Sequence, residues 1–405
     1  MKIFKFIVFN TFLKKPVILA CTLLLFFLGN YIIFITARMS LSTYEGYKEV
    51  KPLNKAGNLS ANVMPGSNAG TISEEDVQEV YDYLTHKKYA LLNEGFVVDI
   101  PNAYDMNVNV AYVNKDYYDA SRQFSLSNGT GLRFDYPLYD DTIPVLIGQG
   151  LSKDYPVGSV ISVTDPALEK NVKYKVSGIL KTNAYHSNFN QISSKQYYNF
   201  SVIVPVNDTY IKESPNVGFK LQGLFDIILL DSSKEESDEL KNLLKQNLGM
   251  DFKFYTEEEN NSYYSDTFIG SLKIVALISV ILIIILTAMS LLSSLTGIKL
   301  MIKDLTINLL TGLSYRRLKH IIYGYYGILF LINLLILFLI TAYSRFDAWI
   351  NKSALSATFG LLALTSTDAM ALLTVVAFDV FISLLIVNTI MWHIKKIPIS
   401  LGVMQ

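Results

Sequence analysis

The segment from Ile274 to Leu295 reads IVALISVILIIILTAMSLLSSL and contains no charged residue. A helix of about 20 apolar residues is long enough to cross the hydrocarbon core of a bilayer, which is ~30 Å thick. A basic stretch over 299–320, KLMIKDLTINLLTGLSYRRLKH, follows it, and a second apolar run begins at Ile321. This order predicts two membrane helices joined by a short polar connection.

The composition favours a membrane protein with four spans. The chain has 405 residues, of which 51% are hydrophobic, and its mean hydropathy of +0.31 is too apolar for an ordinary soluble enzyme. Apolar runs predict transmembrane helices at 16–37, 272–297, 321–343 and 369–393. The single cysteine, Cys21, lies in the first of these and excludes a disulfide within one chain.

The charges are segregated along the chain although the formal net charge is zero. Residues 39–266 hold 31 acidic and 20 basic side chains, whereas the remainder of the chain holds 4 and 15. The excess of basic residues falls at 1–15, 298–320 and 394–405. Because basic loops stay on the cytoplasmic side of a membrane, we expect all three segments in the cytoplasm.

The region 38–271 is then expected outside the cytoplasm, together with the short loop 344–368, whose charges balance. The apolar core of the first span is longer than the roughly 7–15 residues of a secretory signal peptide. This length favours an uncleaved anchor over a cleaved signal. With the anchor in place, 1–15 is a cytoplasmic amphipathic arm and 394–405 a cytoplasmic tail.

Region 38–271 is patterned as a mixed α+β domain. Residues 40–68 are polar and predict loops with a strand or two, and Ser73 and Asp76 then predict a capping box at the start of a helix. Alternating apolar residues predict strands at 96–100 and 108–113. The face of the first helix that we expect to be buried carries Val77, Val80, Tyr81 and Leu84.

The end of the same region predicts a further helix at 233–248 and a strand at 252–255. Such mixing of helices and strands is typical of an α+β fold. We therefore predict an α-helical membrane protein with four transmembrane helices and a mixed α+β extracytoplasmic domain between helices 1 and 2.

The connection 298–320 is patterned as an amphipathic helix of its own. Its apolar residues recur at spacings of three and four, which places them on one helical face. They are Ile302, Leu305, Leu309, Gly312 and Leu313. Arg316, Arg317 and Lys319 are expected to form its cationic end. A short amphipathic helix between two membrane spans is suited to contact a partner protein.

Three polar residues fall inside the predicted spans: Asn30, Asn333 and Asp379. A carboxylate within a membrane is costly, so Asp379 is a candidate functional residue. The structural alternative is a hydrogen bond inside the bundle, to Asn30 or Asn333. The sequence favours this alternative because a lone intramembrane acid without a basic partner makes no proton relay.

Catalytic motifs are absent from the sequence. It contains no phosphate-binding Gly-x4-Gly-Lys-Ser/Thr loop, no Gly-x-Ser-x-Gly elbow and no His-Glu-x-x-His motif. The four histidines are scattered, and the run Glu257–Glu259 lacks the surrounding ligands of a calcium loop. We therefore expect neither catalysis nor a cofactor, metal ion or nucleic acid.

The stretch 303–317 resembles the cytoplasmic loop of MacB-like and FtsX-like ABC transporter permeases, which docks on the ATPase. The shared pattern is a charged start, aliphatic residues and then Gly-aliphatic-Ser-x-Arg-Arg. The family usually begins this stretch with Glu-aliphatic-Gly, whereas this chain has Asp304-Leu305-Thr306. The resemblance implies ATPase contacts for Asp304, Ile307, Leu309, Leu310, Gly312, Leu313, Ser314, Arg316 and Arg317.

Region 38–271 resembles the outer domain of MacB-like proteins. The similar pieces are the strand 143–148, the turn Pro156-Val157-Gly158, and the strands 172–180 and 202–205. A glycine at such a turn permits a positive φ. The segment 397–401 is similar to the closing motif of the family.

The resemblance implies a permease subunit in a bacterial cytoplasmic membrane, driven by a separate ABC ATPase. It also implies a dimer with itself or with a second permease, an adaptor or membrane-fusion protein as a possible further partner, and a peptide or other amphiphilic substrate for export. The alternative is an FtsX-like regulator that activates a cell-wall hydrolase without transport. The large, multi-stranded outer domain favours the MacB-like side.

Overall fold

The chain forms two compact units, each with its own core. The computed structural model describes residues 4, 8, 15–65, 72–121, 124–138 and 142–396. The first unit, here called the membrane unit, comprises residues 1–41, 271–343 and 366–405. The second, here called the outer unit, comprises residues 42–270 and 344–365. Most of the predicted arm 1–15 and the motif 397–401 lie outside the described residues.

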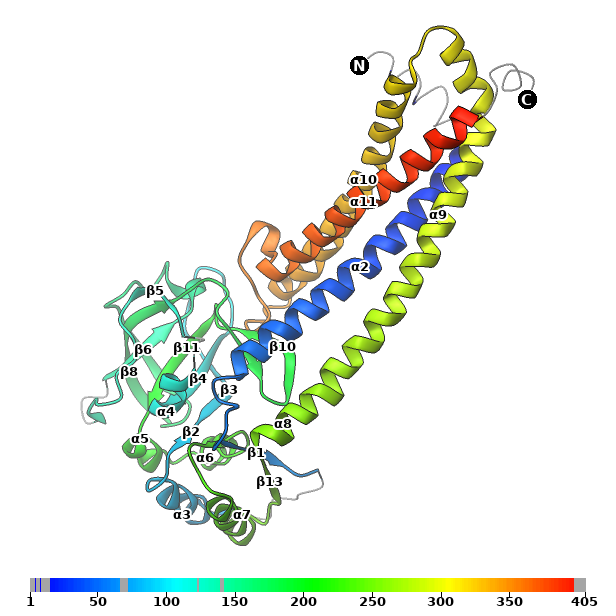
Figure 1. The fold of residues 1–405 in the computed structure, drawn as a ribbon. Helices are drawn as coiled ribbons and strands as arrows, with labels where there is room; N and C mark the ends of the chain where they lie inside the picture. The colour runs from blue at the N-terminus through cyan, green and yellow to red at the C-terminus, as the bar shows by residue number, and fades with distance from the viewer. Residues whose placement is uncertain are drawn as a thin grey trace. The chain divides into compact units, whose positions relative to one another are not determined.

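Four described helices are long and apolar enough to cross a membrane. They are α2 (Pro16–Val50), α9 (Gly270–Leu310), α10 (Tyr315–Ile350) and α11 (Ser366–Lys396), the long rods of Figure 1. Each contains one of the predicted spans, which confirms four candidate membrane helices. Helix α9 continues a shorter helix, α8 (Glu257–Tyr263), through a π-helical turn, η4 (Tyr264–Ile269).

The membrane unit is held together by apolar side chains from all four helices. Ile302 of α9, Ile322 of α10 and Ile386 of α11 are buried in one cluster. Phe26 of α2 belongs to the same cluster, and its ring centroid lies 4.6 Å from that of Phe330 on α10. The packing therefore joins the two ends of the chain to the central α9–α10 pair.

Helix α2 extends further than the sequence predicted. Residues 40–50, expected as loop or strand, form its last turns, and the first strand of the outer unit begins only at Leu59. Extending an existing helix needs no new nucleus, so weak helix formers such as Ser42 and Gly46 are tolerated there. The buried side chain of Val50 and ion pairs of Glu45 and Glu49 then fix these turns.

The larger sheet of the outer unit mixes parallel and antiparallel strands. Strand β4 is parallel to β11, and β6 is parallel to β8, whereas the other neighbours are antiparallel. Strand β7 pairs with β8 beside the main path. In spatial order the path is β3 (Leu92–Val98), β4 (Val108–Asn114), β11 (Ser201–Val206), β6 (Thr142–Ile147), β8 (Lys170–Leu180) and β5 (Leu126–Gly129), with β7 at Val160–Asp165.

The smaller sheet is antiparallel. Its spatial order is β13 (Phe252–Tyr255), β1 (Leu59–Val63), β12 (Ile228–Leu229) and β2 (Tyr89–Ala90). Helices α3 (Glu74–Leu84) and α7 (Lys234–Leu248) pack beside this sheet (Figure 1). The other described helices of the outer unit are α4 (Lys115–Ala120), η3 (Gln149–Leu151), α5 (Asp208–Glu213), α6 (Val217–Gly223) and η5 (Leu361–Ala363).

Several sequence predictions for this unit are confirmed. Helix α3 has the capping box of Ser73 and Asp76, and its four predicted apolar residues are buried. Helix α7 begins after a second capping box at Ser233. Gly158 adopts a φ of +94° in the turn before β7, as the Pro-Val-Gly pattern predicts. The mixed α+β class of the outer unit follows from both sheets and these helices.

The segment 344–365, which lies within the predicted short loop 344–368, is part of the outer unit. Helix α10 runs on to Ile350, and Trp349 packs its ring 5.5 Å from that of Phe200, centroid to centroid. The backbone N–H of Tyr197 donates to the carbonyl of Leu355 at 2.8 Å. The sequence shows no periodic pattern after Ile350, so only the tertiary contacts reveal this role.

A hairpin missed by the sequence pattern packs on the outer end of α2. Its strands are β9 (Tyr185–Asn188) and β10 (Gln191–Tyr197). The backbone N–H of Ser187 donates to Glu49 at 2.9 Å, and Lys195 forms an ion pair with Glu45. The hairpin is rich in Ser, Asn and Gln, so no apolar alternation marks it.

Candidate coupling site

The predicted coupling helix is not a separate element. Helix α9 continues without a break from the apolar run to Leu310, and α10 begins at Tyr315. The prediction of an independent helix at 298–320 is therefore wrong. No proline stands between Leu295 and Leu310, Gly297 keeps a helical conformation within α9, and the next glycine, Gly312, has a positive φ of +102°. The amphipathic pattern is the end of a long membrane helix.

Residues 304–317, which include the end of α9 and the first turn of α10, are here called the coupling tip. Within it, local hydrogen bonds close the four-residue turn between the two helices. The backbone N–H of Leu313 donates to the carbonyl of Asn308 at 3.0 Å, which satisfies a carbonyl at the end of α9. Ser314 accepts a hydrogen bond from the backbone N–H of Arg317 at 3.3 Å, as the cap of α10. Ser314 thus has a structural role besides its predicted one.

The predicted contact residues divide into a packed set and an exposed set. Leu309 and Leu313 pack against the core of the membrane unit, and Asp304 is half-buried. The side chains of Ile307 and Leu310 are 44% and 59% exposed. The remaining predicted residues are also exposed: Gly312, Ser314, Arg316 and Arg317. The exposed part of the tip therefore combines apolar side chains with a pair of arginines.

Arg316 and Arg317 lie in the first turn of α10, and not at the end of the preceding helix as predicted. A cation at a helix N-terminus opposes the helix dipole and costs about 0.3–1 kcal/mol. These arginines therefore do not stabilise their own helix. Lys303 is likewise exposed, and Asp304 is the one acid of the stretch 299–320. The tip is thus suited to an acidic partner surface.

The intramembrane polar residues are partly paired. The amide of Asn30 on α2 donates to Asp379 Oδ2 on α11 at 3.2 Å, and both side chains are buried. Asn333 on α10 is buried as well, but among the described residues neither its Nδ2 nor Asp379 Oδ1 has a hydrogen-bond partner. Asn30 is therefore the partner of Asp379, which favours the structural alternative.

One ion pair in this unit was not predicted. Arg38 Nε of α2 lies 2.9 Å from Asp368 Oδ1 of α11, and the Asp368 side chain is fully buried. Both residues lie outside the predicted spans, and they are far apart in the chain. Nothing in the sequence therefore indicated this ion pair. Within the ranges that the structure describes, no group of three or more His, Cys, Asp or Glu side chains could hold a metal ion.

Comparisons with known proteins add a structural likeness. No protein-family model matches the chain, and no curated protein matches it. Among solved structures, the extracellular domain of YknZ, a noncanonic ABC-type transporter from Gram-positive bacteria, is similar with 14% sequence identity. The alignment covers 49% of this chain and 100% of that domain, with a TM-score of 0.31. A TM-score of this size does not establish a shared fold.

Proposed function

We propose that this chain is the permease subunit of a MacB/FtsX-type ABC transporter. A separate ATPase would bind the coupling tip from the cytoplasm, and the outer unit would lie on the far side of the membrane. The observation that carries the proposal is the exposed part of the tip, which combines Ile307 and Leu310 near the end of α9 with Arg316 and Arg317 in the first turn of α10. Apolar contacts would supply affinity, and the arginines would set the orientation of docking.

Continuous helices support transmission of a movement from the tip to the outer unit. Helix α2 passes from the membrane unit into the outer unit after Leu41, and α10 does so after Tyr343. Residues 344–365 return the chain to α11 after packing within the outer unit. A tilt of these helices would therefore act on the outer unit through the backbone itself, as a two-state transition biased by ATP requires.

The substrate that we propose is a peptide or another amphiphilic molecule, which is exported with or without an adaptor protein. Inside the membrane unit, the one carboxylate within a predicted span, Asp379, is buried and accepts a hydrogen bond from Asn30. This arrangement favours mechanical action on a substrate outside the membrane over passage through one subunit. The subunit would pair with a second copy or a second permease.

The decisive experiment measures binding of candidate ABC ATPase subunits from the same organism by the full-length chain in detergent. We expect Leu310→Asp to lower co-purification of the ATPase at least about tenfold, because it places an unpaired charge in the apolar contact. Leu310 is preferable to Leu309, whose side chain packs in the core.

The matched control is Val160→Asp, the same kind of change at an exposed position of β7 in the outer unit. It should leave ATPase binding and membrane insertion unchanged. Equal co-purification of wild type and Leu310→Asp would remove the basis of the proposal, provided that both proteins enter the membrane in similar amounts.

A further inference from the structure

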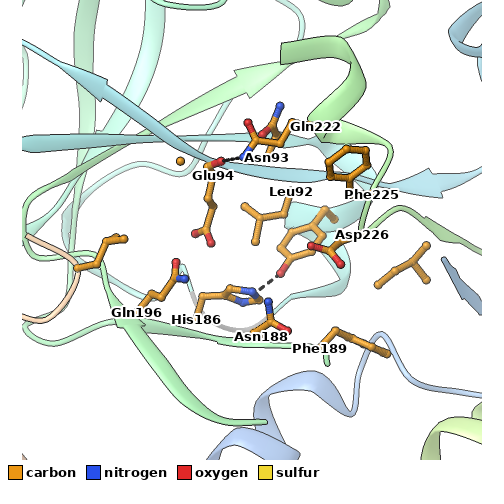
Figure 2. Close-up of a pocket in the computed structure, with 14 residues that line it drawn as sticks. Leu92, Asn93, Glu94, His186, Asn188, Phe189, Gln196, Gln222, Phe225 and Asp226 are labelled. Carbon is orange, nitrogen blue, oxygen red and sulfur yellow. Dashed lines mark hydrogen bonds between the residues drawn. The ribbon is translucent and has the colours of Figure 1, made fainter. Parts of the chain in front are cut away.

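The outer unit contains a polar pocket that the coupling proposal does not use. Its volume is about 300 Å³, at the lower end of the range for small-molecule sites. Figure 2 shows its wall, which is formed by β3, the β9–β10 hairpin and the connection between α6 and β12. Gln222 and Asp226 stand exposed at this wall. A bound group could therefore enter while the rest of its molecule stays outside.

Two carboxylates line the pocket. Glu94 Oε1 accepts a hydrogen bond from the Tyr198 hydroxyl at 2.7 Å, and the carboxylate is directed toward His186 and Gln196 (Figure 2). Asp226 Oδ1 accepts from Asn190 at 3.3 Å, a long contact that leaves its acceptor capacity largely unused. Neither acid has a lysine or arginine partner within salt-bridge distance among the described residues.

An amide oxygen in the pocket lacks a hydrogen-bond donor. Among the described residues, the side-chain oxygen of Gln196 is buried without a partner. The side chain of Asn93 does not face the pocket, because Asn93 pairs with Tyr112 and lies on the same face of the sheet, where its amide donates to the carbonyl of Phe219 at 2.7 Å. A buried acceptor without a donor is unfavourable, so the Gln196 oxygen favours a ligand that brings N–H groups.

The charge of the pocket remains negative when its histidine is counted. His186 Nδ1 lies 3.6 Å from Glu49 Oε1 and 3.4 Å from the Tyr117 hydroxyl. Burial opposes the charged imidazole, but Glu94, Glu49 and Asp226 outweigh burial and raise the pKa of His186. Three carboxylates therefore surround this one imidazole, so the group keeps a net negative charge even with the imidazole protonated. The pocket is suited to a cation and unsuited to an anion.

The pocket also carries aromatic rings, since Tyr117, Phe189 and Phe225 line it. Aromatic faces attract ammonium and guanidinium groups. We propose that this pocket binds the basic side chain of a peptide, a guanidinium or ammonium group, with Glu94 and Asp226 as its counter-ions and Gln196 as an acceptor. This inference does not depend on the ATPase-coupling proposal.

The elements around the pocket connect it to the membrane helices through the chain. His186 contacts Glu49, which lies in the last turns of α2. Leu355, from the segment between α10 and α11, lines the same pocket. A peptide bound here would thus contact or neighbour two segments that continue into candidate membrane helices. Peptide binding in the outer unit could therefore be transmitted to the membrane unit along these helices.

The test is isothermal titration calorimetry of the full-length chain in detergent, without ATPase. The probes are the capped tripeptide Ala-Arg-Ala and the same tripeptide with citrulline, which keeps the shape of arginine but lacks its charge. We expect the arginine peptide to bind at least about tenfold more tightly, because its hydrogen bonds are charge-assisted. Equal affinities of the two peptides would overturn the proposal.

Two variants test whether the arginine peptide binds in this pocket. Glu94→Gln can still accept from Tyr198, so the fold should be retained, and we expect about tenfold weaker binding of the arginine peptide. The control is Asp238→Asn, an exposed acid on α7 outside the pocket, which should change the affinity less than about twofold. Unchanged binding by Glu94→Gln would overturn the assignment of the site.

A third probe, ethylguanidine, distinguishes a peptide from a small free cation. If the ligand is a peptide, ethylguanidine should bind more weakly than Ala-Arg-Ala, because it lacks the flanking groups that extend past the mouth. Equal affinities of these two probes would contradict the peptide as ligand. Thermal unfolding of each variant shows whether a loss of binding arises from misfolding.

Discussion

At the scale of single residues, Asp165 is the most heavily hydrogen-bonded side chain among the described residues of the outer unit. It is fully buried at the end of β7, and its two oxygens accept five hydrogen bonds. Two come from the backbone N–H groups of Ala167 and Leu168, at 2.8 and 2.9 Å. The others come from the hydroxyls of Tyr112, Tyr174 and Tyr210, at 3.2, 2.6 and 2.7 Å.

These contacts keep the tyrosines neutral and the carboxylate satisfied. Burial, and then the charge of Asp165, raise the pKa of Tyr174 and Tyr210 far above the usual range. All three hydroxyls therefore stay protonated and continue to donate over the whole physiological range of pH. No lysine or arginine is needed to hold this buried carboxylate.

We predict that Asp165→Asn destabilises the protein by about 3 kcal/mol, because the amide offers two donors where donors already converge. Tyr174→Phe removes one donor and should cost about 1 kcal/mol. Thermal unfolding of the full chain in detergent measures both changes. Asp238→Asn on the surface is the control and should leave the unfolding temperature unchanged. A loss for Asp165→Asn no larger than for this control would contradict the role of Asp165.

Residue-level properties also decide which predicted site residues can meet a partner. Leu309 and Leu310 are adjacent and alike in the sequence, yet only Leu310 is largely exposed. The sequence could place both on an amphipathic segment, but the direction of each side chain depends on how α9 packs against α10. The pocket beside Glu94 was likewise hidden, because its residues come from strands far apart in the chain.

At the scale of elements, the sequence predicted what local chemistry determines. Helices α3 and α7 carry capping boxes, and the spans are continuous apolar runs, so the sequence predicted these two helices and the spans. The β9–β10 hairpin and the segment 344–365 were not, because their polar residues are ordered by tertiary hydrogen bonds. The prediction of a separate helix in the coupling tip failed for a related reason. Hydrophobic periodicity indicates a helix but does not show whether that helix is the end of a longer one.

The turn between α9 and α10 depends on one glycine. Gly312 has a φ of +102°, and a Cβ built there would meet no atom within 4 Å. Gly312→Ala should therefore act through backbone strain alone, at about 1 kcal/mol. The expected result is a lower unfolding temperature in detergent and weaker binding of the ATPase, because the turn reorients Leu310 relative to Arg316.

Gly327→Ala is the matched control for this change. Gly327 lies within α10, and a Cβ there would also meet nothing within 4 Å. In a helical conformation alanine is favoured over glycine by about 1 kcal/mol. The control should be neutral or slightly stabilising. If Gly312→Ala behaves like Gly327→Ala, the conformation of the turn is not what positions the tip.

At the scale of the whole molecule, the four candidate membrane helices are unequally covered. In the most apolar window of each helix, 33% of the residues are buried for α2, α10 and α11, but only 11% for the helix that contains α9. Exposed aliphatic side chains follow one another along α9, among them Leu277, Ile281 and Ile284. Of the four described helices, α9 is therefore the least covered, and its exposed apolar side chains are the candidate contact for a second permease subunit in the proposed dimer.

Cysteine crosslinking in native membranes tests this arrangement. In a Cys21→Ser background, Ile284→Cys should form a disulfide-linked dimer on mild oxidation, because we place Ile284 close to the twofold axis of the contact, where a residue meets its own counterpart. The control is Ile283→Cys, the neighbouring residue, whose side chain packs within the membrane unit. It should remain monomeric on a non-reducing gel. Equal crosslinking at both positions would indicate random collision, and crosslinking at neither would exclude a homodimer through this face of α9.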